Sequence, residues 1–289
     1  MMDTATKARY IAWAARGWLG GDRSCPGCGS PHTRLLKRKH VVTALFGCDA
    51  CELMFRMPKS SQVEDRAFYE RAYQQGPTTD MPDPDELEAL KRQSFAPIRR
   101  DYTGYIEVLR TLGIGAGDRV YDYGASWGYG SWQFAQAGYQ VYSYEISRIR
   151  ARYAEQHLGC QMLAEPEAVP ERVHCFFASH VLEHLAQPQT LWRIAVDVVR
   201  REGAVVLFMP NGEPGCELRD PERYHQLWGR VHPLLLTSSA VAAMAARHGF
   251  ETLAYSSPYD LDAIAARRPG RLDGDELMVV ARRCKGNAT

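Results

Sequence analysis

From about residue 101 onward, short apolar runs alternate with segments of helix length. The runs that have strand length are residues 119–123, 140–145, 173–178 and 204–209. Strands that alternate with helices form a mostly parallel sheet with helices packed on its faces. Two later runs, 251–256 and 276–281, have no convincing helix between them and are expected to close the sheet as an antiparallel pair. The sequence therefore predicts a doubly wound α/β domain over residues 101–289.

Two further regions are expected ahead of this domain. Residues 1–58 combine a helical stretch with a region rich in cysteine, glycine and basic residues, and residues 59–100 form a polar connector with a helix near 84–95. The helical stretch carries apolar side chains near helical spacing: Tyr10, Trp13, Ala14 and Trp18. Such a stripe is expected to pack on the protein's own body in preference to a membrane or a partner.

Four of the eight cysteines form two C-x-x-C pairs, Cys25 with Cys28 and Cys48 with Cys51. Two such pairs at this separation are typical of a zinc ribbon, in which four thiolates hold one tetrahedral ion. A redox dithiol needs only one pair, placed where a strand turns into a helix. A closed four-thiolate site is structural, so the zinc ion is expected to stabilise the fold and to take no part in chemistry.

Residues 120–130 read V-Y-D-Y-G-A-S-W-G-Y-G and join an expected strand to the next helix. The order of Gly124, Gly128 and Gly130 differs from the G-x-G-x-x-G turn that cradles a pyrophosphate. Asp122 precedes these glycines, and Glu145 ends the next strand, where an acid can accept both hydroxyls of a ribose. The pattern fits S-adenosylmethionine, which has no phosphate and carries positive charge on its sulfonium and amino groups.

Residues 101–283 resemble class I S-adenosylmethionine-dependent methyltransferases, which have a Rossmann-like fold. Besides the cofactor loop, the likeness is carried by S-H-V-L-E-H-L at 179–185, with shorter matches at 206–211, 232–237 and 247–250. The resemblance implies an enzyme with a seven-stranded sheet that ends in an antiparallel hairpin. It also implies cofactor contacts by Asp122, Gly124, Ala125, Ser126, Gly128 and Glu145.

The N-terminal part of the sequence resembles a particular group of methyltransferases. A zinc ribbon followed by Phe68-Tyr69 and Tyr73 is similar to methyltransferases of deoxysugar and surface-polysaccharide pathways. Sugar C-methyltransferases of that group usually carry an extra C-terminal domain, whereas this chain ends soon after its last expected strand. O-methylation of a sugar, a glycan or a related natural product is therefore expected. The alternatives are a quinone or phenol acceptor, a sugar C-methyltransferase, or a non-catalytic zinc-ribbon interaction protein.

Three titratable residues of the 179–185 signature are candidates for catalysis. His180, Glu183 and His184 would share one face of a helix that begins there, at the carboxyl edge of the sheet where ligands bind. His180 is predicted to be the general base that takes the acceptor's proton.

A second interpretation has Glu183 and His184 hold a divalent metal together with His232 or His180. This arrangement is similar to that of metal-dependent ubiquinone-pathway and small-RNA O-methyltransferases, which have Glu in place of His180. In a third interpretation, Glu183 and His184 only tie the chain to neighbouring backbone.

Several aromatic side chains lie near the two expected binding regions. Trp127, Tyr129 and Trp132 are candidates to stack on the adenine or on a sugar, and Tyr224 and Trp228 are candidates to cap the acceptor.

Charge and hydropathy limit the partners. The 35 basic and 34 acidic side chains leave a net charge of +1, which gives no electrostatic drive toward nucleic acid. No stretch approaches the ~20 apolar residues that span a bilayer, and the N-terminus lacks the apolar core of a signal peptide. A cytoplasmic protein with a small-molecule or glycan substrate and no nucleic-acid partner is therefore expected.

Overall fold

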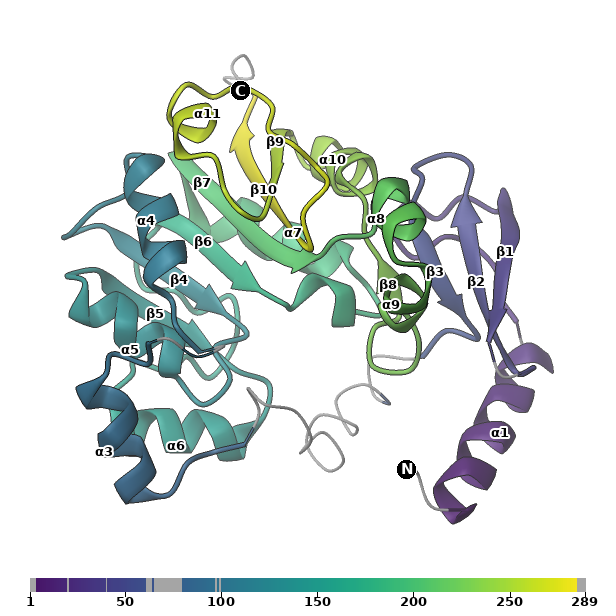
Figure 1. The fold of residues 1–289 in the computed structure, drawn as a ribbon, viewed down its shortest axis with the longest axis horizontal. Helices are drawn as coiled ribbons and strands as arrows, with labels where there is room; N and C mark the ends of the chain where they lie inside the picture. The colour runs from purple at the N-terminus through teal and green to yellow at the C-terminus, as the bar shows by residue number, and fades with distance from the viewer. Residues whose placement is uncertain are drawn as a thin grey trace.

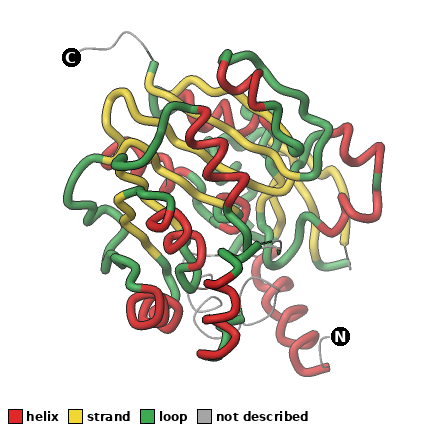
Figure 2. The backbone as a smooth tube through the Cα atoms, turned by 60° about the vertical axis from the view of Figure 1, so that its left-hand side comes forward, coloured by secondary structure: helices red, strands yellow, loops and turns green. Residues whose placement is uncertain are grey.

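The computed structural model of the chain describes residues 4–19, 21–39, 41–60, 64, 80–96, 98 and 100–284. Within them the chain forms a small sheet near the N-terminal helix and a larger sheet with helices on both faces (Figures 1 and 2). The segment with Phe68, Tyr69 and Tyr73 lies outside the described residues. None of the described helices is long and apolar enough to cross a lipid bilayer.

The small sheet is an antiparallel meander that follows helix α1 (Thr4–Leu19). Its strands β1 (Thr33–Lys39), β2 (Thr43–Cys48) and β3 (Met54–Met57) pair in sequence order. A fourth strand, β8 (Leu234–Leu235), comes from far along the chain and pairs with β3. We call residues 21–58, which contain β1 to β3, the N-terminal ribbon. A part of the larger domain therefore completes the sheet of this ribbon.

Helix α1 packs on this sheet through the predicted stripe. Ala14 is fully buried. The Tyr10 hydroxyl lies 2.7 Å from Thr43 Oγ1, and Trp18 Nε1 donates to the carbonyl of Val42 at 2.9 Å. The expectation that the stripe contacts the protein's own body is confirmed.

The larger sheet has six strands in the order β5-β4-β6-β7-β10-β9. They are β4 (Arg119–Tyr123), β5 (Gln140–Tyr144), β6 (Val173–Ser179), β7 (Val199–Pro210), β9 (Phe250–Ser256) and β10 (Glu276–Arg283). The first four in sheet order are parallel, and β10 is antiparallel to both of its neighbours. All six predicted strand segments are confirmed, as is the mostly parallel sheet with an antiparallel strand.

Alternating residues of the strands bury opposite faces of this sheet. Val120 and Val206 pack with helices of one face, and Tyr121 and Val205 pack with helices of the other. The first face is covered by α4 (Thr103–Thr111), α5 (Tyr129–Gln136) and α11 (Leu261–Ala265), and the second by α7 (Gln189–Val198) and α10 (Ser238–Ala246). Burial on both faces is what the near-continuous apolar runs indicated.

The remaining helices are α3 (Pro84–Arg92), α6 (Arg148–Leu158), α8 (Pro214–Arg219), α9 (Pro221–Gln226) and the single 3-10 turn η1 (Leu182–His184). Helix α3 begins where predicted, because the Asp83 side chain accepts from the N–H of Glu86 and Pro84 occupies the first turn. It ends at Arg92, earlier than expected, since Ser94 and Phe95 adopt positive φ angles of 49° and 61°.

Two expectations about the sheet are wrong. The resemblance implied seven strands, but the described residues form six, and at the missing position Met162 makes only an isolated bridge to Ser143. Pro166 follows closely and has no N–H to extend a ladder. The segment between β9 and β10, expected to lack a helix, contains the short helix α11.

Candidate functional site

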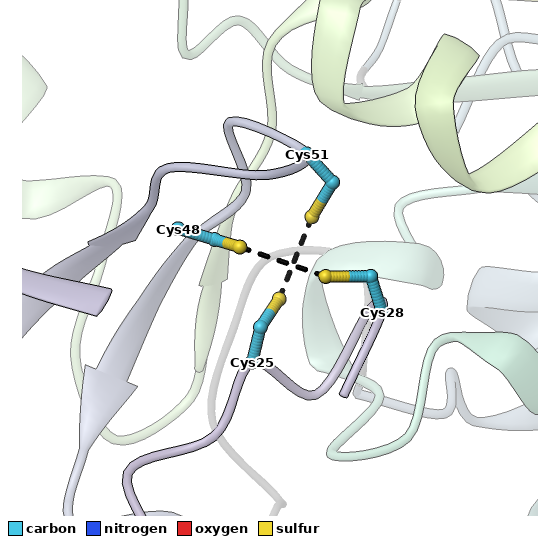
Figure 3. A group of neighbouring side chains, drawn as sticks. All are labelled: Cys25, Cys28, Cys48 and Cys51. Atoms are coloured by element: carbon cyan, nitrogen blue, oxygen red, sulfur yellow. Dashed lines mark hydrogen bonds between the residues drawn. The ribbon is translucent and has the colours of Figure 1, made fainter. Parts of the chain in front are cut away.

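The four paired cysteines converge at one end of the ribbon (Figure 3). Their sulfur atoms all lie within 4.8 Å of one another. The closest contacts cross between the pairs, with Cys25 Sγ 3.5 Å from Cys51 Sγ and Cys28 Sγ 3.5 Å from Cys48 Sγ. A tetrahedral ion with bonds of ~2.3 Å needs sulfur separations of about 3.8 Å. The arrangement thus fits one four-thiolate zinc site, whereas a redox dithiol would pair cysteines within one C-x-x-C.

The first cysteine turn has the backbone that such a site needs. The N–H of Gly27 points at Cys25 Sγ at 3.3 Å, as expected for an amide that stabilises a thiolate. Gly29 has a φ of 76°, a conformation that favours glycine. Cys25, Cys48 and Cys51 are buried, so a bound ion would be closed off from solvent.

The glycine turn after β4 and the acid after β5 meet at the carboxyl edge of the large sheet. The N–H groups of Gly124 and Ala125 both donate to the carbonyl of Tyr144, at 2.8 and 2.9 Å. The Glu145 carboxylate accepts from the N–H of Ser126 at 2.9 Å and from that of Ser147 at 2.8 Å. The predicted cofactor residues are therefore held in one place by backbone hydrogen bonds.

Glycine is required at two positions of this turn. Gly124 and Gly128 have φ angles of 88° and 90°. A Cβ at Gly124 would lie 2.4 Å from Val181 Cγ2, and one at Gly128 would lie 2.7 Å from Ala154 Cβ. The turn therefore packs tightly against both the signature segment and helix α6, and a larger residue would displace it.

Burial controls the charge state of the two acids beside the turn. Burial raises the pKa of Asp122 to about 7, and the charge of the nearby Glu145 adds to this rise. The Ser131 hydroxyl donates to Asp122 at 2.6 Å and lowers the pKa. Burial also raises the pKa of Glu145, whereas the hydrogen bonds from its two backbone N–H donors lower it. A cationic ligand would favour the ionised form of both acids.

Three of the five aromatic candidates are core residues. Trp127 is fully buried, with its ring 5.9 Å from that of Phe95 and 4.9 Å from that of Tyr129. Tyr224 and Trp228 are also buried, and the Tyr224 hydroxyl donates to the carbonyl of Gly212 at 2.7 Å. We expected Trp127 to stack on a ligand and Tyr224 and Trp228 to cap the acceptor. This expectation is wrong, because all three side chains are buried against other residues of the protein.

The 179–185 signature forms a tight turn in place of the expected helix. His180 has a φ of 54°, and only the single turn η1 follows. The side chains nevertheless converge, since Glu183 Oε1 lies 3.3 Å from His180 Nδ1 and 3.9 Å from His184 Nε2. The spacing correctly grouped the three residues although the helical geometry was wrong.

A second carboxylate, missed in the sequence, holds the other side of His180. Glu276 Oε1 lies 2.8 Å from His180 Nε2 and accepts from the Tyr105 hydroxyl at 2.7 Å. Its other oxygen accepts from the Tyr259 hydroxyl at 2.5 Å. Glu276 and the tyrosines belong to no local motif, and only the start of β10 beside the end of β7 brings them to this edge.

The two carboxylates determine the charge of His180. Burial disfavours the imidazolium, but Glu183 and Glu276 outweigh it and raise the pKa of His180 to about 10. Burial likewise works against the charge of Glu183, yet His180 lowers the pKa of that carboxyl to about 2. The two carboxylates therefore favour the imidazolium form of His180, and a ring in that form cannot accept a proton.

On its other side, Glu183 faces two further histidines. His184 Nδ1 lies 2.8 Å from the carbonyl of Val231, and His232 Nδ1 lies 3.2 Å from that of Leu227. A carbonyl oxygen only accepts, so each Nδ1 carries a hydrogen, and a neutral ring then keeps a lone pair on Nε2. Burial lowers the pKa of His232 to about 4, which keeps its ring neutral.

These residues fit a divalent metal. One ligand atom from each of Glu183, His184 and His232 lies within 4.8 Å of the others. Both Glu183 oxygens are buried and accept no well-directed hydrogen bond, so the 3.3 Å contact with His180 acts as an ion pair only. Histidines that donate Nδ1–H to a carbonyl and present Nε2 beside a carboxylate have the outer contacts expected of metal ligands.

Comparisons with known proteins identify the fold. No family model and no curated protein matches the chain. Magnesium protoporphyrin IX methyltransferase from Synechocystis PCC 6803, with bound S-adenosylhomocysteine, is similar with a TM-score of 0.50 and 14% identity, covering 78% of this chain and 100% of that one. A second similar structure is a chain from the complex between the Haloferax volcanii Trm112 methyltransferase activator and a methyltransferase. Its TM-score is 0.50 and its identity 12%, and the match covers 71% of this chain and 99% of that one. The chain thus has the fold of class I S-adenosylmethionine-dependent methyltransferases.

Proposed function

We propose that this chain is an S-adenosylmethionine-dependent methyltransferase that methylates a hydroxyl oxygen of a sugar, a glycan or a related natural product. The observation that carries the proposal is the position of Glu145. Two backbone N–H groups hold its carboxylate beside the Gly124–Gly128 turn, at the sheet edge where such folds bind ligands. In this role Glu145 accepts hydrogen bonds from the ribose hydroxyls, and Asp122 with the glycine turn receives the ammonium group of the zwitterionic amino-acid end.

The reaction moves one methyl group and releases one proton. The acceptor oxygen attacks the methyl carbon as the carbon–sulfur bond breaks, which leaves S-adenosylhomocysteine and a methyl ether. Positioning supplies much of the acceleration, but an alcohol also needs help to lose its proton. The residues beside the cofactor turn that offer this help are His180 and the group of Glu183, His184 and His232.

The geometry supports a metal more than a histidine base. A bound divalent ion at Glu183, His184 and His232 would act as a Lewis acid that acidifies the acceptor hydroxyl. The general-base role of His180 stays a prediction, and it requires the ring to lose the proton that Glu183 and Glu276 stabilise. We propose that His180 instead orients Glu183 and closes this side of the site.

A carbohydrate acceptor is supported by the resemblance described above and by a cavity beside Glu276. The cavity has a volume of about 510 Å³ and includes Ser257, whose hydroxyl accepts from the N–H of Glu276. Its lining contains three arginines and three aspartates, which balance in charge: Arg219, Arg223, Arg271, Asp220, Asp273 and Asp275. A neutral ligand with many hydroxyl groups matches such a lining of donors and acceptors better than an ion does.

Replacing Glu145 is expected to weaken cofactor binding. A charge-assisted hydrogen bond contributes ~1.5–3 kcal/mol, so Glu145→Ala should raise the dissociation constant of S-adenosylmethionine roughly ten- to a hundredfold. Isothermal titration calorimetry measures this without knowledge of the acceptor. Glu155→Ala, which removes an exposed glutamate from α6, is the matched control and should bind like the unmodified protein. Equal affinity in both variants would place the cofactor elsewhere, and absence of binding to the unmodified protein would refute the proposed function.

A further inference from the structure

The segment of residues 227–235 is held on one side by the N-terminal ribbon. Among the described strands, β8 has no partner in the six-stranded sheet and pairs with β3 alone, with Leu235 opposite Met54 and Leu234 opposite Phe55. The N–H of Arg56 extends this pairing by donating to the carbonyl of Pro233 at 2.7 Å. Figure 1 shows β8 beside β3, at the boundary between the ribbon and the rest of the fold.

A lysine of the ribbon holds the other end of the same segment. Lys39 Nζ donates to the carbonyls of His225 and Trp228, both at 2.9 Å, and lies 5.0 Å from the centre of the Trp228 ring. His225 lies in the last turn of α9 and Trp228 just beyond it, where helix carbonyls have no partner within the helix. The Lys39 side chain therefore acts as a charged C-terminal cap that is supplied by a different sheet.

Apolar packing reinforces the two attachments. Leu45 of β2 belongs to one buried cluster with Tyr224, Trp228 and Leu235. Leu36 and Met54 of the ribbon pack against the same cluster. Backbone pairing, a charged cap and a shared core thus connect the ribbon to this segment.

The segment in turn fixes the rings of two candidate site residues. The carbonyls that orient His184 and His232 belong to Val231 and Leu227. Leu227 lies between the two Lys39 contacts, and Val231 lies between Trp228 and β8. His232 itself belongs to the segment. If these carbonyls moved, both rings would lose the hydrogen bonds that direct their Nε2 atoms toward Glu183.

We infer that the ribbon is a positioning element of the acceptor side of the site, and that Lys39 and the metal-bound state of Cys25, Cys28, Cys48 and Cys51 keep residues 227–235 ordered. Zinc that is remote from the chemistry would then determine whether His184 and His232 face Glu183. The inference deepens the proposed function, because it names residues that position its candidate groups. Its test reports local order and does not depend on methyl transfer.

Hydrogen exchange of the full chain tests the inference through Lys39→Met, which keeps the apolar stem and removes the donor. Amides of residues 227–235 should exchange roughly tenfold faster or more, since one hydrogen bond to a charged donor shifts a local opening equilibrium by about that factor. Amides of β9 and β10 and the affinity for S-adenosylmethionine should stay within about twofold of the unmodified protein. Lys59→Met is the matched control, because Lys59 donates within the ribbon, to Asp22 and Ser24, and makes no hydrogen bond to the described residues 227–235.

Two further measurements separate positioning from general stability. When a chelator removes zinc from the folded protein, residues 227–235 should lose protection before β9 and β10 do, and before the zinc-free chain aggregates. Long-range proton–nitrogen spectra should show His184 and His232 with hydrogen on Nδ1 in the unmodified protein, and a shift toward Nε2 in Lys39→Met. The inference is overturned if Lys39→Met exchanges like Lys59→Met, if the zinc-free protein keeps the segment protected, or if β9 and β10 lose protection together with it. If the protein bound no S-adenosylmethionine, the proposed function would be refuted, but the hydrogen-exchange result would still test the inference.

Discussion

Cys48→Ser is expected to abolish zinc binding and to make most of the protein insoluble. Apparent binding energies of structural zinc sites are ~10–16 kcal/mol, which is comparable to or larger than the ~5–15 kcal/mol net stability of a domain. The ribbon core rests on this site, because Cys25, Cys48 and Cys51 lie in the same buried cluster as Phe46 and Phe55. Elemental analysis should find about one zinc per chain in the unmodified protein and none in the variant.

A cysteine outside the site provides the control for this experiment. Cys284 is exposed and distant in sequence from the two pairs, so Cys284→Ser should retain zinc and solubility. Unmodified protein that is purified without chelators and contains no zinc would contradict the prediction. Full solubility of Cys48→Ser without zinc would show that the ribbon folds without its ion.

Loss of the Glu183 carboxylate is expected to have the second large effect. If Glu183, His184 and His232 bind a metal, chelation should abolish turnover, and added Mg²⁺, Mn²⁺ or Zn²⁺ should restore it. Mn²⁺ binding, measured by electron paramagnetic resonance, should weaken at least ~100-fold in Glu183→Ala, since removal of a direct ligand costs more than loss of its outer partners. The same variant should bind S-adenosylmethionine normally, because Glu183 lies outside the cofactor turn.

The general-base alternative predicts a different pattern. His180→Ala should then lower turnover by ~10²–10⁴, with cofactor affinity nearly intact and with resistance to chelation. His32→Ala removes an exposed ribbon histidine and should leave both properties unchanged. Full activity in His180→Ala and in His184→Ala would defeat both mechanisms and leave positioning to carry the reaction.

The parts of the fold that could be predicted are those with local signals. Apolar runs located the strands because a strand that is buried on both faces must be apolar along its length. The cysteine pairs and the loop from Asp122 to Glu145 were found because their residues lie close in sequence and need particular chemistry. The missing seventh strand was implied by resemblance alone, and the residues around Met162 form only an isolated bridge there.

The parts that escaped prediction depend on contacts between distant residues. Glu276 meets Tyr105 across 171 positions, and no local pattern marks either residue. Trp127 looked like a ligand platform because it lies in the cofactor loop, but Phe95 from the connector buries it. His180 is predicted to be a base from its place at the carboxyl edge of the sheet. Its charge depends on Glu276 as well as on Glu183, and only the assembled sheet brings Glu276 near.

The pairing of β8 with β3 limits how this chain can be divided. From the sequence we propose three regions, residues 1–58, 59–100 and 101–289. A cut after residue 58 would expose the edge of the two-residue strand β8. It would also expose Leu234 and Leu235, which are each 1% exposed in the intact chain. A fragment without the ribbon would present an unpaired backbone edge and an apolar patch, both of which promote aggregation. The ribbon and the larger domain are therefore expected to be inherited, expressed and degraded as one unit.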